Sequence, residues 1–112
     1  MTKDEITADV AATLNGLPER YDYFDCMQII ERKIGFFLKT DRAATIEALE
    51  DWLDSEGVGW TEYGASVAEI FGLRELCPAI RRVRDEIVAG RLYLPYYADN
   101  YTRVLRSLGC ED

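Results

Sequence analysis

Carboxylates are the side chains of this chain whose type and spacing could do chemistry. Between Arg42 and Arg74 the sequence holds seven acidic residues and no basic one. Four of these acids are spaced i, i+3, i+4 and i+7, which places them on one face of a helix: Glu47, Glu50, Asp51 and Asp54. We call these four residues the acidic stripe. Like charges at such spacings repel one another by roughly 0.2–0.5 kcal/mol per pair, so the pattern indicates a basic partner.

Catalysis by these carboxylates is the weaker interpretation. Glu47 and Asp51 are one helical turn apart, and a carboxylate pair can serve a glycosidase or bind magnesium. A solvated helix face, however, lacks the pocket that raises the pKa of a catalytic acid. The chain also contains no histidine, which removes the usual general base, the Ser-His and Cys-His nucleophile pairs and most zinc sites. We therefore expect no enzyme activity, no cofactor and no metal.

The spacing of the glycines and of the cysteines argues against two further kinds of functional site. The segment Gly57-Val58-Gly59 lacks the lysine of a phosphate-binding loop and follows no strand. The three cysteines are odd in number and have no C-x-x-C spacing, so we expect neither a disulfide framework nor a zinc site. Their apolar neighbours predict buried structural thiols at Cys26, Cys77 and Cys110.

The acidic stripe itself has two interpretations, and both stay open. It is either a solvated face that tolerates its own repulsion or a docking surface for a basic protein. In the second case the following loop supplies an anchor at Trp60, because a tryptophan beside flexible glycines is a typical hot spot. Trp60 could instead fold back on the core as a staple between two helices. The candidate partner-binding residues are Glu47, Glu50, Asp51, Asp54, Glu56 and Trp60.

Length and composition describe one ordinary globular domain. The chain has 112 residues, of which 48% are hydrophobic and 30% charged. No apolar run approaches the roughly 18 residues of a membrane span, and the first residues lack the layout of a signal peptide, so we expect a cytoplasmic protein. The net charge of −8 disfavours nucleic acid and favours fast capture of a basic protein.

Capping residues, glycines and prolines predict about six antiparallel helices and essentially no sheet. These helices position the residues discussed above. A capping box at Thr2-Lys3-Asp4-Glu5 opens a first helix that ends at Asn15-Gly16. A second helix covers about 18–39, with Pro18 at its first position. Its apolar seam follows the helical period and predicts a central core element: Tyr23, Met27, Ile30, Ile34 and Phe37.

The acidic stripe lies on a third helix that begins near Asp41 and has an apolar inward face. We expect a flexible loop over 55–60 and a fourth helix with Thr61 as its N-cap and Gly72 as its end. A fifth helix covers about 74–89, and Pro95 opens a sixth that ends at Gly109. The connections are short enough for antiparallel neighbours.

The chain also repeats itself. Two segments match at an offset of 34, Tyr63-Gly64-x-x-Val67-x-x-Ile70-Phe71 and Tyr97-Ala98-x-x-Tyr101-x-x-Val104-Leu105. One helix earlier, two shorter segments match at an offset of 31, Ala48-Leu49-x-x-Trp52 and Ala79-Ile80-x-x-Val83. Two helix pairs at nearly constant spacing are typical of a helical solenoid.

The residues that carry a family resemblance are Ala68-Glu69-Ile70-Phe71-Gly72-Leu73, then Leu76-Cys77-Pro78-Ala79-Ile80 and Val83. This run resembles a short HEAT-like repeat of the kind found in phycobilin lyase-type proteins. There a helix ends at a glycine, and after a short turn the next helix opens with an apolar residue, proline, alanine and a further apolar residue. The segment 101–109 resembles the closing helix of a following unit.

The resemblance covers residues 43–109 and implies two HEAT-like helix pairs, with an N-terminal helix pair over 1–40, in one domain of residues 1–112. The alternative is a compact bundle of six unrelated helices. Such repeats bind proteins through an exposed face. We therefore expect a protein-binding module, most concretely a small acidic inhibitor of the immunity-protein type that neutralises a basic toxin or nuclease. The alternatives are an adaptor subunit that oligomerises through helical faces and a small-molecule-binding helical domain with a tyrosine-lined pocket.

Overall fold

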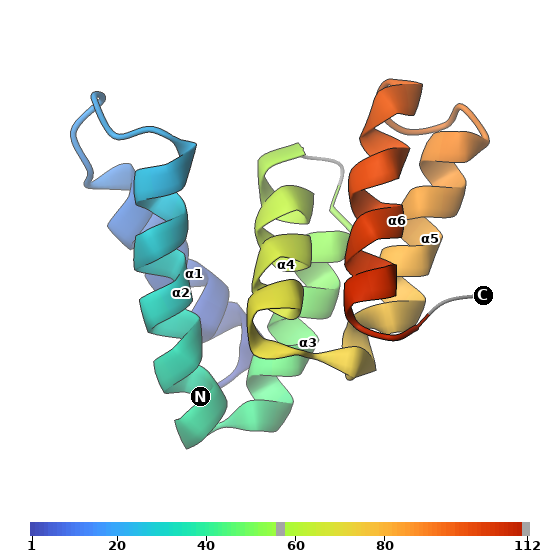
Figure 1. Cartoon of the computed structure of the whole chain (residues 1–112). Coiled ribbons are helices and arrows are strands. Elements are labelled where there is room, and N and C mark those ends of the chain that lie inside the picture. The colour runs from blue at the N-terminus through green and yellow to red at the C-terminus, as the bar shows by residue number, and fades with distance from the viewer. Residues whose placement is uncertain (56–57, 111–112) are drawn as a thin grey trace. The chain divides into compact units, whose positions relative to one another are not determined.

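The structure is a computed structural model that describes residues 1–55 and 58–110 (Figure 1). These residues form six α-helices, two short 3-10 helices and no strand, which confirms the predicted all-α class. The 3-10 turns η1 and η2 lead directly into α5 and α6. The helices are α1 (Lys3–Asn15), α2 (Tyr23–Thr40), α3 (Arg42–Leu53), α4 (Val58–Phe71), η1 (Arg74–Leu76), α5 (Cys77–Val88), η2 (Pro95–Tyr97) and α6 (Ala98–Ser107).

The chain divides into two compact units, Met1–Ala48 and Leu49–Asp112. The boundary falls inside α3, so the first part of this helix belongs to one unit and its last turn and a half to the other. The first unit contains α1 and α2, which pack together, and the second contains α4, α5 and α6.

Acidic and hydroxyl side chains fix where α1 and α2 begin. The Thr2 hydroxyl accepts a hydrogen bond from the backbone N–H of Glu5, whose carboxylate accepts one from the N–H of Thr2, as the predicted capping box requires. Asp22 and Asp25 form the same arrangement at α2. The second helix therefore starts later than we predicted. Pro18 lies in the preceding turn, where its carbonyl accepts a hydrogen bond from the N–H of Tyr21.

The predicted seam of α2 is buried only in its C-terminal half. Ile30, Ile34 and Phe37 are at most 5% exposed, whereas Tyr23 is 43% exposed. The buried side chains of α1 are Ile6 and Val10, both in its first half. The buried residues thus lie in the first half of α1 and in the second half of α2.

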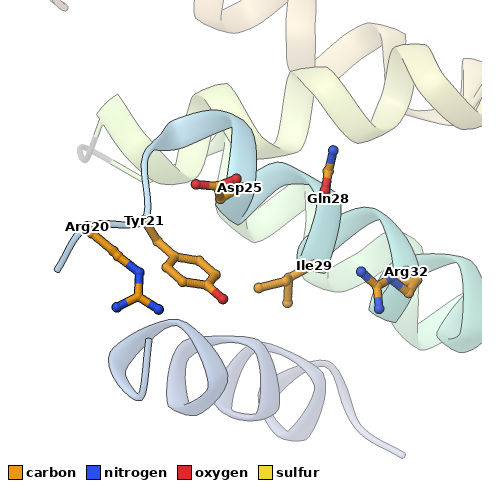
Figure 2. A pocket seen from close by; sticks show the side chains of 6 residues that line it. All are labelled: Arg20, Tyr21, Asp25, Gln28, Ile29 and Arg32. Atoms are coloured by element: carbon orange, nitrogen blue, oxygen red, sulfur yellow. The ribbon is translucent and has the colours of Figure 1, made fainter. Parts of the chain in front are cut away.

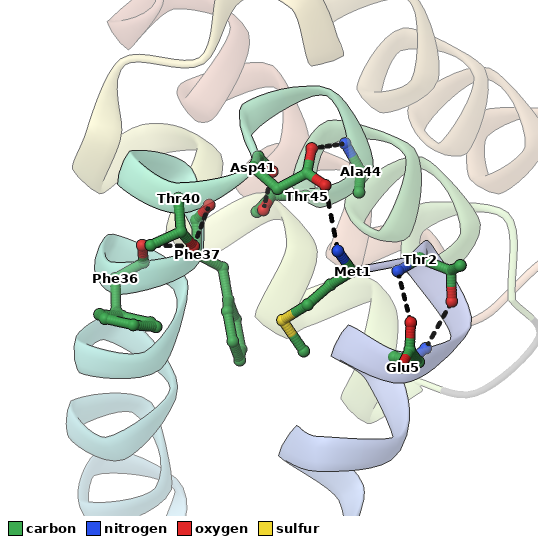
Figure 3. A network of polar contacts seen from close by, with 9 residues as sticks. All are labelled: Met1, Thr2, Glu5, Phe36, Phe37, Thr40, Asp41, Ala44 and Thr45. Carbon is green, nitrogen blue, oxygen red and sulfur yellow. Dashed lines mark hydrogen bonds and ion pairs between the residues drawn. The ribbon is translucent and has the colours of Figure 1, made fainter.

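The junction of α2 and α3 is a polar network centred on Asp41 (Figure 3). Its carboxylate caps α3 by accepting from the N–H of Ala44 at 3.2 Å, and it also pairs with the Met1 amino group at 3.4 Å. The bond from Ala44, followed by the bond from the amino group, lowers the pKa of Asp41. The hydroxyl of Thr45 donates to the carbonyl of Asp41 at 2.7 Å, which explains how this threonine is fully buried at no loss of hydrogen bonding.

In the second unit α6 packs mainly on α5 and also on α4. The end of α3 packs closely on α4 at Gly64. A Cβ added at Gly64 would lie 3.0 Å from Cγ of Leu53, which is 1% exposed. The helices α5 and α6 contribute further fully buried side chains to this core: Ile80, Ile87, Tyr101, Val104 and Leu105.

Three glycines end three successive helices in the same way, as the sequence predicted. Gly72, Gly90 and Gly109 have φ values of 64°, 80° and 73°. In each case the next residue donates its N–H to the carbonyl five positions back, at 2.9–3.0 Å, which is the Schellman motif. A residue with a Cβ is disfavoured at such φ values, so glycine at these positions sets the helix lengths.

Two predictions about α4 are wrong. The helix begins at Val58, so the expected loop over 55–60 is shorter, and Thr61 lies inside the helix rather than at its N-cap. Thr61 is fully buried, and its hydroxyl is 2.6 Å from the hydroxyl of Tyr93. That long-range hydrogen bond replaces the local capping bond on which the prediction depended.

The expectation of free thiols at all three cysteines is also wrong. Cys77 and Cys110 form a disulfide with a Cα–Cα distance of 6.1 Å, and Cys26 is left as a half-buried free cysteine. Arg74 and Arg81 donate to the carbonyls of Gly109 and Cys110. The end of α6 is therefore held beside the start of α5. The two cysteines are 33 positions apart, so no local pattern in the sequence predicts their pairing.

Candidate functional site

The four carboxylates of the acidic stripe are all exposed in the structure. Glu47, Glu50 and Asp51 lie on consecutive turns of α3, and Asp54 follows directly after its last residue. The opposite face of the helix is buried, with Leu49, Trp52 and Leu53 at most 2% exposed. One face of the helix is thus buried, and its charged face is open to solvent. Glu56 lies outside the described residues.

One ion pair compensates this surface in part. Asp54 lies 3.7 Å from the guanidinium of Arg82, and both side chains are more than half exposed, so the pair contributes little energy. Among the residues that the structure describes, neither Glu47 nor Glu50 forms an ion pair. No local spacing links Asp54 to Arg82, whereas Arg84 pairs with its sequence neighbour Asp85 at 3.1 Å.

Trp60 lies against α3. Its ring centroid is 4.8 Å from that of Trp52, and Tyr63 meets it edge-on at 5.9 Å. This is the staple geometry that the sequence left open, and it keeps Trp60 half-buried.

A cavity of about 240 Å³ opens between the end of α3, α5 and the segment that follows α5. Arg91 donates two hydrogen bonds to Glu86 across its rim, and this contact lowers the pKa of Glu86 and raises that of Arg91. The cavity is smaller than the roughly 300–1,000 Å³ of typical ligand sites. Its lining has mixed charge: Leu53, Asp54, Ser55, Arg82, Val83, Glu86, Arg91 and Leu92.

A second polar cluster joins α4 to the start of α6, and sequence reasoning missed its central member, Glu62. This carboxylate accepts a hydrogen bond from the Asn100 amide at 3.1 Å, and partial burial raises its pKa. The contact spans 38 residues, so no local pattern could have revealed it. We call Glu62, Tyr93, Tyr96, Tyr97 and Asn100 the Glu62 cluster.

Stacked tyrosines form the rest of the Glu62 cluster. The rings of Tyr96 and Tyr97 lie 4.5 Å apart and nearly parallel, and Tyr93 lies 5.6 Å from Tyr97. A hydrogen bond with Tyr96 is the largest cause that raises the pKa of Tyr97, and the charge of Glu62 adds to it. Tyr101 of α6 is fully buried and does not belong to this group. Neither described cavity is lined by these tyrosines.

A larger cavity, about 550 Å³, belongs to the first unit (Figure 2). Arg20 and Arg32 lie at its two ends, with Tyr21 and Ile29 between them, and the Arg20 guanidinium lies 5.9 Å from the Tyr21 ring centroid. Asp25 and Gln28 complete the lining. Two guanidinium groups make this lining richer in hydrogen-bond donors than the acidic surface of α3.

Comparisons of the chain with protein families, with curated proteins and with solved structures find no match. The HEAT-like resemblance therefore stays a prediction. No helix in the described part of the chain is long and apolar enough to cross a membrane. Over the same residues, no group of three or more potential ligands is placed to hold a metal ion.

Proposed function

We propose that this protein is a non-enzymatic protein-binding module, and most concretely a small acidic inhibitor of the immunity-protein type. Its partner would be a basic protein such as a toxin or nuclease. The observation that carries this proposal is the exposure of Glu47, Glu50 and Asp51 on one face of α3 and of Asp54 directly after it. A surface of this kind is suited to steering a basic partner, because complementary charge raises the rate of association.

The burial pattern of α3 supports the same proposal. Its apolar face is packed against the protein, so the acidic face can meet a partner without unfolding any element. Trp60, half-buried against Trp52, is the aromatic residue that we propose as a second contact. Half-exposed aromatic side chains of this type are frequent anchors in protein interfaces.

The alternative is an adaptor subunit that oligomerises through a helical face. Phe24 and Phe36 of α2 are 68% and 61% exposed, which favours this alternative because exposed aromatic side chains often mark interaction sites. Light scattering distinguishes the two proposals. A stable dimer whose mass does not change with salt concentration supports the adaptor, and a monomer that captures a basic protein supports the inhibitor.

The proposal is tested by capture from the native host at low and moderate salt. The test variant combines Glu47→Gln, Glu50→Gln, Asp51→Asn and Asp54→Asn. The control combines Asp4→Asn, Glu19→Gln, Glu31→Gln and Asp99→Asn, which removes the same number of charges from exposed residues elsewhere. We expect a basic partner to be lost from the test variant alone.

A captured partner is then purified and its association rate measured. The rate should fall at least tenfold with the test variant and should fall steeply with salt for the wild type. Equal binding of the wild type and the test variant would contradict a role of the acidic stripe.

The cytoplasmic location stays a prediction, and the Cys77–Cys110 disulfide bears on it. Disulfides persist in oxidising compartments and are rare in the cytosol. Protein isolated from its host under acid quench and alkylated in denaturant should show three reactive thiols if it resides in the cytoplasm. A single reactive thiol, at Cys26, would place the protein in an oxidising compartment instead.

A further inference from the structure

Glu62 is a half-buried carboxylate whose described hydrogen-bond donor is neutral. The Asn100 amide donates to it through Nδ2, while Oδ1 of the same amide accepts from Arg103 at 2.9 Å. Arg103 is in turn paired with Glu69. The nearest cation of α6 is thus committed to another carboxylate, and Glu62 keeps acceptor sites that one amide does not fill.

Aromatic rings lie beside this carboxylate. Thr61, the residue before Glu62, contacts the Tyr93 hydroxyl at 2.6 Å. The Tyr97 ring lies 5.6 Å from that of Tyr93 and 4.5 Å from that of Tyr96. Tyr96 is 65% exposed and its neighbour Leu94 59% exposed. The face of a tyrosine ring attracts a cation, and a carboxylate beside it adds a hydrogen-bonding counter-charge.

The backbone before these rings is held in an uncommon conformation. Tyr93 is the one residue other than glycine with positive φ, 51°, among the residues that the structure describes. Its hydroxyl lies 2.6 Å from that of the buried Thr61, so α4 holds the turn that presents Tyr96 and Tyr97. Strained bulky residues of this kind cluster at functional sites.

We propose that the Glu62 cluster binds the guanidinium group of an arginine side chain presented by the basic partner. The guanidinium would donate to the Glu62 carboxylate and stack on the exposed ring of Tyr96. Arginine fits better than lysine because its planar group can do both at once. This inference rests on the proposed function for the nature of the partner, and it assigns that partner an anchor separate from the acidic stripe.

The cation site can be tested without any partner. The probe is N-acetyl-arginine amide, and its neutral counterpart is N-acetyl-citrulline amide, which has nearly the same shape. NMR spectra of the labelled protein should show saturable shifts at the Asn100 side-chain amide and at Tyr97 with the arginine probe. Citrulline should shift the same signals at least tenfold less at equal concentration. Equal shifts from both probes would overturn the proposal.

Two variants locate the site. Glu62→Gln keeps the size of the side chain and an oxygen for Asn100, so it is expected to fold, and it should weaken arginine binding at least tenfold. Tyr96→Ala should weaken it several-fold. Glu50→Gln removes one charge from α3 and serves as the matched control, with unchanged binding of the probe. Arginine binding that survives Glu62→Gln would refute the assignment.

The outcomes also separate this inference from the proposed function. If the probe binds through Glu62 but no basic partner is found, the cation site stands and the inhibitor proposal fails. If a basic partner binds wild type and Glu62→Gln equally, and the probe shifts nothing, the inhibitor proposal stands and this inference fails. If both are right, Glu62→Gln should speed dissociation of the partner, whereas loss of the acidic stripe should slow its association.

Discussion

At the scale of single residues, Glu62 illustrates how partial burial changes a carboxyl group. Burial disfavours its charged form and raises its pKa, and the Asn100 amide is the one described donor that faces it. The neighbouring Tyr97 is neutral at pH 7, and Arg103 is paired with Glu69. Ionisation of Glu62 therefore opposes folding at neutral pH.

Replacing Glu62 by glutamine should accordingly stabilise the protein at pH 7 and leave it unchanged near pH 3.5. The folded state binds the proton of Glu62 more tightly than the unfolded state does. Wild type therefore loses stability, relative to Glu62→Gln, as the pH rises from the unfolded pKa of about 4.3 through the higher folded pKa. The gain is below about 1 kcal/mol because the group remains partly solvated. Urea unfolding at several pH values measures it, and a wild type more stable at pH 7 would contradict the reasoning.

Gly64 and Gly59 form a matched pair in α4. Gly64→Ala would bring its Cβ to 3.0 Å from the buried Leu53, whereas the Cβ of Gly59→Ala meets nothing within 4 Å. Alanine improves helix propensity by up to about 1 kcal/mol at either position. At Gly64 the overlap, typically about 1–3 kcal/mol, should exceed that gain. Chemical unfolding should therefore show Gly64→Ala less stable, and Gly59→Ala at least as stable, as wild type.

At the scale of elements, local chemistry sets where the helices begin and end. Capping boxes start α1 and α2, and the three Schellman glycines stop α4, α5 and α6. Pro95 opens the 3-10 turn η2, and α6 itself begins at Ala98, later than we predicted. The core between these ends is built by α6, which contacts both α4 and α5.

The backbone angles of the glycines that follow the helices predict a difference in stability between two alanine substitutions. Gly90→Ala places a Cβ on a backbone with φ of 80° and should reduce stability by about 1 kcal/mol, although the space around it is open. Gly16→Ala ends α1 at φ of −86°, a conformation that alanine adopts freely, and should be neutral or slightly stabilising. Thermal unfolding by circular dichroism compares the two, and equal losses at both sites would show that φ is not the cause.

At the scale of the whole molecule, the disulfide cross-links the second unit and leaves the first outside its loop. The bond closes a loop between Cys77 and Cys110, which are 33 positions apart in the sequence. Both tryptophans, Trp52 and Trp60, also belong to the second unit, so their fluorescence reports on the unfolding of that unit. Tryptophan fluorescence can therefore follow the effect of the disulfide on the second unit.

Reduction of the disulfide should destabilise the second unit by about 4 kcal/mol, because a loop of this length loses that much chain entropy on cross-linking. The midpoint of tryptophan fluorescence should move to lower urea on reduction, and the double variant Cys77→Ala/Cys110→Ala should show the same midpoint with or without reductant. Cys26→Ala, which leaves the bond intact, serves as the control. An unchanged fluorescence midpoint would argue that the bond contributes no net stability.

The sequence by itself determined the helical class, most helix ends and the exposed face of α3. These features depend on contacts within four or five residues: the Thr2–Glu5 box, the glycine stops and the spacing of Leu49, Trp52 and Leu53 against the acidic stripe. Such contacts repeat with the helical period, so they can be read without knowing how the helices pack.

Only the tertiary structure decided the contacts between distant segments. The Thr61–Tyr93 hydrogen bond, the Glu62–Asn100 pair and the Cys77–Cys110 disulfide join residues separated by 32, 38 and 33 positions. Their side chains are ordinary in their local context, and no spacing rule links them. Packing of α6 against α4 and α5 brings them together, because burial of apolar area selects the arrangement and polar pairs form where that arrangement places them.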